Sequence, residues 1–320
     1  MTHTRIAISL LSASLLAAPA FAQTYPSKNI RIINAFAPGG ASDVVARSFA
    51  QKLTEYMGQQ VTVENRVGAG GNIASEHVAR SAPDGYTILM GTLFLATNAS
   101  LYSKLTWDAQ KDFAPISMVT ASPLILCVHP SLPVKSTKEL IALAKQRPGE
   151  LNFPSAGNGT SMHLSGELFN MMAGIKTQHV PYKGSAPGVL DLVSGRVQFM
   201  LNPMPEPMAF IQNGRLRALA TSTAKRIEAL PNLPPVADAI PGYETITWQG
   251  FLVPAGTPKP VIDRLHTEFI KALKEPDFAA RMRGLGLEIY GNTPAEFAQY
   301  IREESVKWGK VIKATGAKLD

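Results

Sequence analysis

The chain has 320 residues, a formal charge of +7 and a single cysteine, Cys127, so an intramolecular disulfide and a cysteine-rich metal site are excluded. Its basic residues are scattered and not interleaved with aromatic residues, which argues against nucleic acid as a partner. About 300 residues beyond a leader can bury a core without disulfides, and this length favours two domains.

The first residues have the pattern of a secretory leader. Arg5 precedes an apolar stretch, residues 6–18, and Ala20-Phe21-Ala22 is a small-residue cleavage pattern. The stretch is shorter than the roughly 18 to 20 residues that cross a bilayer. We expect residues 1–22 to be a cleavable signal peptide and the mature chain to be exported, with the bacterial periplasm as the best fit.

Strand-like and helix-like segments alternate after the leader. The strand-like segments are Ile30–Phe36, Val61–Asn65, Tyr86–Met90 and Leu124–Val128. The helix-like segments are Asp43–Met57, Ile73–Ser81 and Thr137–Gln146. This βαβ alternation is typical of parallel sheets and predicts an α/β fold.

A second set of elements follows, which predicts a second α/β lobe. Its short strands are Leu151–Phe153, Lys176–Val180, Val197–Leu201 and Leu216–Ala220, and its helices are His163–Met172 and Ala186–Ser194. Ser136 with Glu139 and Thr293 with Glu296 have the spacing of capping boxes. The helical segments 261–273, 277–283 and 295–314 are expected to pack on one of the two lobes.

The stretch FAPGGASD, residues 36–43, joins the first strand to the first helix. Gly39 and Gly40 allow a ligand to approach the backbone closely, and Ser42 or Asp43 can cap the helix. Free amides and the helix dipole at such a corner suit an anion. Ordinary turn chemistry is the alternative, and this stretch alone does not decide between them.

Three further glycine-rich corners precede helices. GAGGN, residues 68–72, lacks the spacing of a dinucleotide fingerprint because position 73 is Ile, so it is interpreted as a tight packing turn. SAGNGTSMHL, residues 155–164, is a second candidate anion site. VPYKGSAP, residues 180–187, is a third, in which Tyr182 and Lys183 are as consistent with core and surface roles as with a ligand.

Catalytic and metal sites find little support in the sequence. Ser161 and His163 lie near glycines, but GTSMH is not the G-x-S-x-G motif of hydrolases. The histidines do not have the spacing of zinc ligands. We therefore expect no catalytic residues, no metal and no cofactor.

Several motifs in order resemble one family of transport receptors. They are YPSKNIRIINAFAPGGASDVVAR (25–47), VENRVGAGGNIASEHVARSAPDGYTILMGT (63–92), KDFAPIS (111–117), VPYKGSAPGVLDLVSGRVQFM (180–200), GRLRALATST (214–223) and WQGFLVPAGTP (248–258). They are similar to the extracytoplasmic substrate-binding proteins of the tripartite tricarboxylate transporter family, the Bug or TctC-like proteins.

The resemblance implies a fold and a function. The fold is a two-lobed, type II (Venus-flytrap) periplasmic binding protein with two Rossmann-like domains joined by a two-strand hinge. Domain I takes residues 23–124 and 246–320, and domain II takes residues 125–245. The protein would be a monomer that captures a small organic carboxylate and delivers it to the large and small membrane subunits of a transporter.

The resemblance also implies the ligand-binding residues, position by position. They are Ala37, Pro38, Gly39, Gly40, Ser42 and Asp43 in the first loop, Ser155, Ala156, Gly157, Asn158, Gly159, Thr160 and His163 in the second, Tyr182, Lys183, Gly184 and Ser185 in the third, and Thr92 and Asn202 at strand ends. A periplasmic hydrolase and a ligand-sensing receptor are the alternatives. The sequence does not choose between a dicarboxylate, a tricarboxylate, an aromatic acid and an amino acid.

Overall fold

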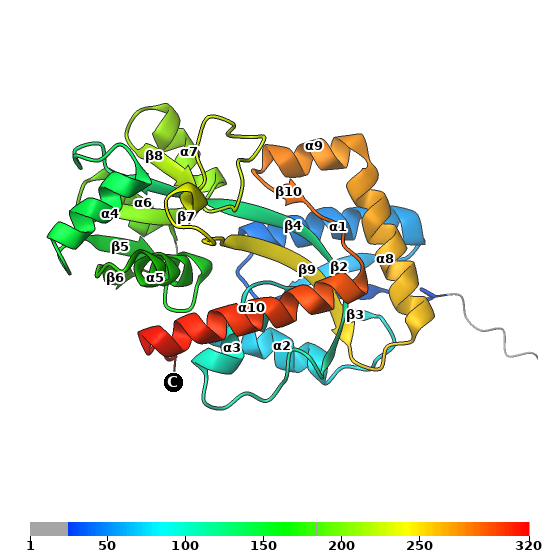
Figure 1. Cartoon of the computed structure of the whole chain (residues 1–320). Helices are drawn as coiled ribbons and strands as arrows, with labels where there is room; N and C mark the ends of the chain where they lie inside the picture. The colour runs from blue at the N-terminus through cyan, green and yellow to red at the C-terminus, as the bar shows by residue number, and fades with distance from the viewer. Residues whose placement is uncertain (1–24, 183–184, 320) are drawn as a thin grey trace, which may run out of the picture.

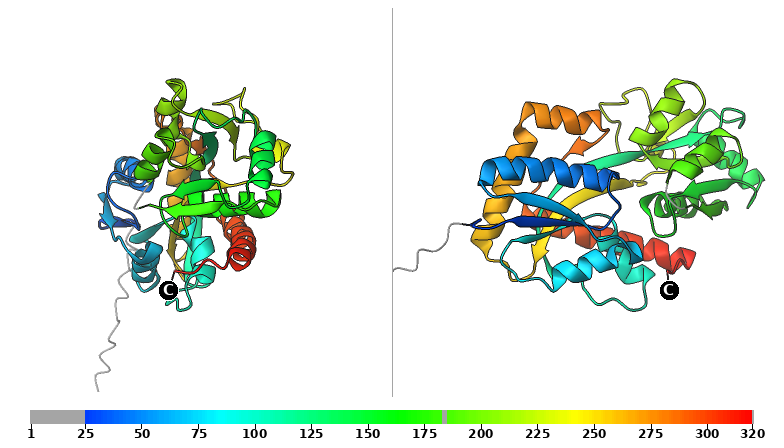
Figure 2. Two further views of the ribbon diagram at one scale, coloured as in Figure 1. Left: turned by 90° about the vertical axis from the view of Figure 1, so that its left-hand side faces the viewer. Right: turned by 180° about the vertical axis from the view of Figure 1, so that it is seen from behind.

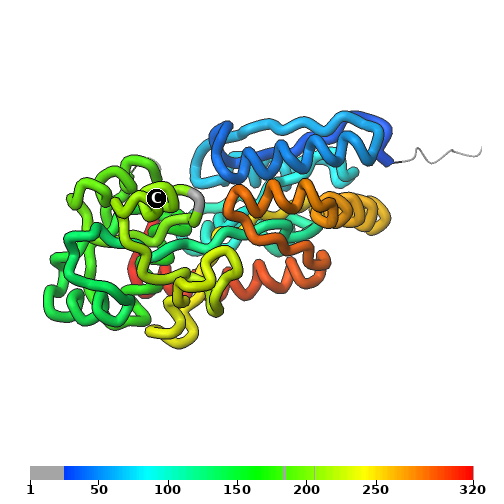
Figure 3. The backbone as a smooth tube through the Cα atoms, turned by 90° about the horizontal axis from the view of Figure 1, so that it is seen from above, coloured from blue at the N-terminus to red at the C-terminus, as the bar shows by residue number. Residues whose placement is uncertain are grey.

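The computed structural model describes residues 25–182 and 185–319, which form two lobes (Figure 1). The predicted signal peptide, Lys183 and Gly184 lie outside the described residues. Seen from above, the lobes occupy opposite ends of the molecule (Figure 3). No helix in the described ranges combines the length and the apolar composition that a membrane span requires.

The elements divide between the two lobes, with three long elements reaching across or toward both. The first lobe contains β1 (Ile30–Asn34), α1 (Ala41–Met57), β2 (Val61–Asn65), a 3-10 turn (Ala69–Gly71), α2 (Asn72–Ala79), β3 (Thr87–Gly91), α3 (Phe94–Leu101), α8 (Lys259–Lys274), α9 (Pro276–Gly284) and β10 (Glu288–Ile289). The second contains α4 (Thr137–Gln146), β5 (Asn152–Ser155), α5 (Ser161–Ala173), β6 (Gln178–Pro181), α6 (Ser185–Val193), β7 (Phe199–Pro203), α7 (Pro205–Gln212), β8 (Arg217–Thr221) and a 3-10 turn (Val236–Asp238). The long elements are β4 (Phe113–Val128), β9 (Ile246–Pro254) and α10 (Pro294–Thr315).

The sheet of the first lobe has the order β10-β4-β9-β3-β1-β2. β1 is parallel to β2 and β3, as the βαβ pattern predicts, but β9 is antiparallel to β3 and β4, and β10 is antiparallel to β4. Apolar residues of α1, α8 and α9 pack against one face of this sheet. Residues of α2, α3 and α10 pack against the other, and Figure 2 shows these two layers of helices from behind.

The second lobe is built on the far end of β4. There β4 pairs antiparallel with both β7 and β8, and β5 and β6 form a separate parallel pair. Its core gathers residues from α4, α5, α6 and these strands, together with Leu93, Ala96 and Leu101 from the start, middle and end of the α3 region. The predicted second set of strands and helices is therefore confirmed, with boundaries shifted by a few residues.

Strand β4 is three times longer than the strand that the sequence predicts over residues 124–128. The sequence does not predict the full strand because it contains Pro115 and Pro123, and proline is usually confined to edge strands and bulges. The structure accommodates Pro115 beside a shift of register with β9 between Pro115 and Ser117. Up to Pro123 the strand pairs with β9, and from Leu124 it pairs with β7 and β8, so it passes from one lobe to the other.

Helix α10 packs on both lobes, whereas the sequence led us to expect packing on one (Figure 1). The predicted capping box is present, since the Thr293 side chain accepts from Glu296 N and the Glu296 carboxylate accepts from Thr293 N. Phe297 and Ile301 belong to the core of the first lobe. Trp308, Val311 and Ile312 belong to the core of the second. The 22-residue length of the helix explains this reach, at about 1.5 Å per residue.

Candidate functional site

The first loop leads from β1 into α1 and presents an uncapped helix start. Residues 36–41 are exposed, and Gly39 has φ +83°. The N-cap of α1 is Gly40, in an extended conformation, and no side chain caps the first turn. The expectation that Ser42 or Asp43 caps α1 was wrong, because the helix starts at Ala41 and both residues lie inside its first turn. The first-turn amides of this 17-residue helix are therefore not occupied by a capping side chain.

Asp43 shapes this loop from within the helix. Its side chain is 3% exposed and accepts hydrogen bonds from Gly39 N (2.9 Å), Arg47 Nε (2.9 Å) and Asn65 Nδ2 (2.8 Å). Burial raises the pKa of Asp43, but these hydrogen bonds outweigh it, so the pKa lies below its usual value. Asp43 thus holds Gly39 in place, and its direct contact with a ligand stays a prediction.

Replacing Asp43 with asparagine is expected to lower the free energy of unfolding by about 2 kcal/mol at pH 7, because hydrogen bonds to a charged acceptor are lost. A lowered folded-state pKa stabilises the fold above about pH 4, and this contribution disappears as the pH falls through the folded pKa. The stabilities of the two proteins should therefore converge in acid. Urea unfolding at pH 7 and pH 3 measures this.

The matched control is Asp263→Asn, which removes the charge of an i,i+4 pair with Lys259 whose aspartate is 53% exposed. Its effect should stay within about 0.5 kcal/mol. Equal losses in the two variants would contradict the role given to Asp43.

The second loop joins β5 to α5, and two of its backbone N–H groups donate hydrogen bonds to side chains of the loop and of the first turn of α5. Gly157 N donates to Ser155 Oγ (3.0 Å), and Gly159 N donates to His163 Nδ1 (3.1 Å). The Thr160 side chain caps α5 by accepting from His163 N. Two glycine amides expected to face a ligand are thus bonded within the loop. His163, which is 6% exposed, supports the loop from behind.

The third loop lies against the second. Tyr182 N donates to Ser155 O (3.0 Å), and a Cβ on Gly157 would lie 3.4 Å from Tyr182 O. The Tyr182 hydroxyl donates to Asp191 (2.7 Å), so the ring is fixed toward α6. Ser185 begins α6. The described part of the third loop is therefore in contact with the second loop.

Two predicted site residues lie at strand ends, and both are buried. Thr92 follows β3 and leads into α3. Asn202, on β7, is completely buried and donates to Glu206 Oε2 (3.2 Å), while its Oδ1 has no partner among the described residues. A buried amide oxygen without a hydrogen-bond partner can accept a hydrogen bond from a ligand hydroxyl or from a water.

Helix α3, which sequence reasoning missed, connects the first and second loops. At its start, the Phe94 ring lies 6.2 Å from the Phe36 ring of the first loop. At its end, the Leu101 side chain lies 2.9 Å from a Cβ built on Gly159. Eight residues of helix span about 12 Å. The first and second loops thus lie at the two ends of one short helix.

The GAGGN turn packs against this same helix. A Cβ on Gly71 would meet the Phe94 ring at 2.9 Å, and Asn98 Nδ2 donates to Gly70 O (2.9 Å). The interpretation of GAGGN as a packing turn agrees with these contacts, although its partner is α3 and not only the preceding strand. A small-residue turn leaves room for a helix that the sequence motif alone does not reveal.

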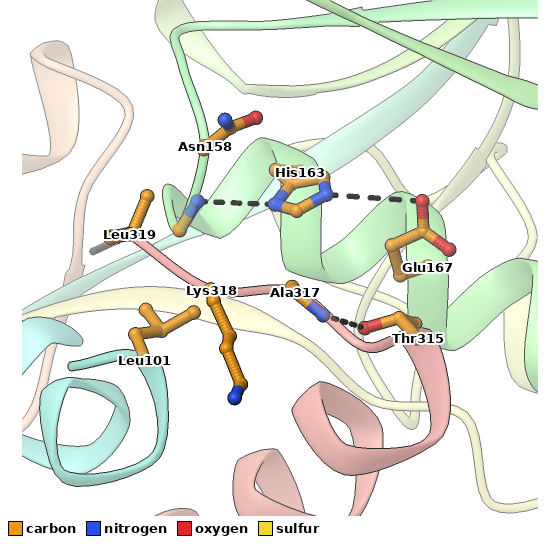
Figure 4. A pocket seen from close by; sticks show the side chains of 9 residues that line it. Leu101, Asn158, His163, Glu167, Thr315, Ala317, Lys318 and Leu319 are labelled. Atoms are coloured by element: carbon orange, nitrogen blue, oxygen red, sulfur yellow. Dashed lines mark hydrogen bonds and ion pairs between the residues drawn. The ribbon is translucent and has the colours of Figure 1, made fainter. Parts of the chain in front are cut away.

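A cavity of about 230 Å³ lies beside the second loop (Figure 4). It is lined by Leu101, Asn158, Gly159, His163, Glu167, the last residue of α10 (Thr315) and residues 317–319 of the C-terminal tail. Leu319 N donates to Leu101 O (3.0 Å), which fixes the tail across α3. In Figure 4 the Lys318 side chain runs away from His163. No sequence signal pointed to this tail, because its partners are more than 150 residues away.

Among the described residues, the second loop has no arrangement of side chains that supports hydrolase chemistry. The Ser161 hydroxyl bonds to Thr247 Oγ1 (2.9 Å) and not to His163. His163 Nδ1 is occupied by Gly159 N, so it is not available as a base toward Ser161. In the described ranges, no three His, Cys, Asp or Glu side chains gather as metal ligands would.

Comparison with known proteins gives a consistent set of similarities. Residues 45–317 match the model of the tripartite tricarboxylate transporter family receptor. The chain is 37% identical to Protein BugT of Bordetella pertussis over 307 residues, which covers 95% of this chain and 94% of BugT.

Two solved structures from Rhodopseudomonas palustris are also similar. One, a protein with adipate, has a TM-score of 0.81 and 38% identity, covering 91% of this chain and 98% of that one. The other, MatC with bound malate, has a TM-score of 0.78 and 29% identity, covering 90% of this chain and 100% of MatC.

Proposed function

Because the chain belongs to the family of tripartite tricarboxylate transporter receptors, we propose that its ligand is a small dicarboxylate held between the first and second loops. The protein is a solute-binding receptor with a two-lobed type II fold, and it is not an enzyme. Such a receptor recognises its ligand without changing it.

The observation that carries this proposal is the uncapped start of α1. Its first-turn amides have no side-chain cap, and the loop before them is exposed and contains two adjacent glycines. The dipole of a 17-residue helix adds partial positive charge at this end. A carboxylate fits this environment without an arginine partner, because backbone N–H groups supply the hydrogen bonds.

The second carboxylate would lie toward the other lobe. There the second loop contacts the third, and α3, a helix about 12 Å long, lies between the first loop and Gly159. Adipate and malate, the ligands of two similar proteins, are both dicarboxylates, which supports this chemistry. The residues we propose for the site are those expected from the sequence, with Asp43 and His163 as supports of their loops.

Closure of the lobes would bring these surfaces onto the ligand. We propose residues 23–124 with 246–320 as domain I and residues 125–245 as domain II. The change in the partners of β4 after Pro123, and the start of β9 at Ile246, support these boundaries. The two strands would then be the hinge.

Delivery to a membrane transporter follows from the family. We propose that the receptor is exported to the periplasm behind a cleavable signal peptide, that it acts as a monomer, and that it hands its ligand to the large and small membrane subunits. The motifs of residues 1–22 and the family of the chain support this location.

Titration with adipate, malate and the neutral diamide adipamide tests the ligand class. Either dicarboxylate at about 100 times its dissociation constant should stabilise the fold by about 2.7 kcal/mol, seen as a rise in melting temperature. Adipamide has the same length as adipate without its charge, so it should give no rise. Equal shifts from adipate and adipamide, or none from a panel of organic acids, would overturn the proposal.

A further inference from the structure

Two histidines from neighbouring elements stack behind the second loop. His163 lies in the first turn of α5 and His179 lies on β6. Their ring centroids are 3.9 Å apart and their planes differ by 24°. His179 also lies against the Phe153 ring, at 5.2 Å. Neither ring bonds to an acid at hydrogen-bond distance, so this pair differs from the histidine–carboxylate pairs of catalytic sites.

His163 contacts the second loop near its end, at Gly159. Its Nδ1 accepts from Gly159 N at 3.1 Å, which requires a free lone pair on Nδ1 and places the proton of the neutral ring on Nε2. Nε2 points toward Glu167 Oε1, at 3.8 Å, as Figure 4 shows. That distance is too long for a hydrogen bond, so the bond to Gly159 is the specific one.

His179 contacts the start of the second loop through the Ser155 hydroxyl. Its Nε2 lies 2.6 Å from Ser155 Oγ, and Ser155 Oγ lies 3.0 Å from Gly157 N. Gly157 N donates to the Ser155 hydroxyl, whose own hydrogen can go to His179 Nε2 at 2.6 Å or to Gly157 O at 3.0 Å; the shorter contact favours His179 Nε2 as the acceptor. Ser155 is completely buried, and Gly157 O, at 3.0 Å, is the other acceptor that the described residues place beside its hydroxyl.

We propose that His163 and His179 are positioning residues, which fix Gly157 and Gly159 of the ligand loop by accepting hydrogen bonds through neutral ring nitrogens. Gly157 has φ +127° and Gly159 has φ +77°, conformations that are open to glycine, so hydrogen bonds to their amides help to select one conformation among the several that a glycine can adopt. The inference deepens the proposed function, since it rests on the second loop as a ligand surface.

The surroundings keep both rings neutral. Burial lowers the pKa of His163 to about 4, and burial together with the neighbouring His163 lowers the pKa of His179 to about 3. Glu167 Oε1, on α5, lies 3.8 Å from His163 Nε2, and Lys318 of the tail lines the same cavity as His163. Protonation of His163 at Nδ1 would set an N–H against the Gly159 N–H and break the bond.

The test compares truncation with replacement of the acceptor. In His163→Asn the side-chain oxygen takes the place of Nδ1, and in His179→Gln it takes the place of Nε2, whereas His163→Ala and His179→Ala remove the acceptor. Hydrogen exchange of the ligand-free protein is followed in the peptide covering residues 155–160. Binding of adipate is measured on the same samples.

Each alanine variant should raise loop exchange about tenfold and weaken adipate binding, since one buried hydrogen bond is lost. The Asn and Gln variants should stay within about threefold of the wild type. His129→Ala is the control, because His129 bonds to Ser131 on an exposed turn and should change neither value.

Two results would overturn the inference: unchanged loop exchange in the alanine variants, or Asn and Gln variants as impaired as the alanine ones. The exchange measurement does not need a ligand. If wild type bound no carboxylate, the proposed function would fail while the loop result still decided the role of the histidines.

Discussion

Replacing Gly39 with leucine is expected to weaken dicarboxylate binding at least about 100-fold, equivalent to about 2.7 kcal/mol. Gly39 has φ +83°, and no atom lies within 4 Å of a Cβ built on it. A leucine there would occupy open space in the loop that precedes the α1 amides, where we propose that the carboxylate binds. Calorimetric titration with adipate or malate measures the loss.

Gly214→Leu is the matched control for this substitution. Gly214 has φ +68° and also has nothing within 4 Å of its Cβ position, but it lies on the exposed turn between α7 and β8. Leucine in a left-handed conformation costs about 1 to 2 kcal/mol at both positions. The melting temperatures should fall alike, and only Gly39→Leu should lose binding. Full affinity in Gly39→Leu would remove the first loop from the site.

Replacing Trp308 with alanine is expected to lower the free energy of unfolding by about 3 to 5 kcal/mol. Trp308 is completely buried in the core of the second lobe. Its Nε1 donates to Glu304 Oε2 (2.7 Å), so the substitution also leaves a buried carboxylate, 5% exposed, without that donor. Chemical unfolding followed by circular dichroism measures the change.

Val306→Ala provides the comparison on the same helix. Val306 is two residues away and 61% exposed, so its loss should change stability by no more than about 0.5 kcal/mol. A small effect of Trp308→Ala, comparable to that of Val306→Ala, would mean that the C-terminal half of α10 contributes little to the second lobe.

The sequence predicted elements whose signals are local. The capping pair Thr293 and Glu296 marks the start of α10, and the apolar run near Ile30 marks β1. The glycines of the first loop likewise identify a turn into a helix, which the structure places directly before Ala41. These features depend on residues within one or two helical turns, so a single sequence contains the information.

The remaining features depend on partners that are distant in the chain. Leu319 reaches Leu101, and His179 reaches Ser155 across 24 positions. Strand β4 contains two prolines, and its pairing with β9 overrides their local preference. Asn65, on β2, likewise donates to Asp43 across 22 positions, a contact that the local sequence does not reveal.

The seating of α10 in both cores restricts how the molecule can move. A closing motion that pulled Trp308 or Ile301 out of its core would expose large apolar side chains, at a cost that one small ligand does not repay. A closing motion that keeps both ends of α10 in place would turn about a line near this helix, and the largest displacements would then lie on the side of the molecule away from it.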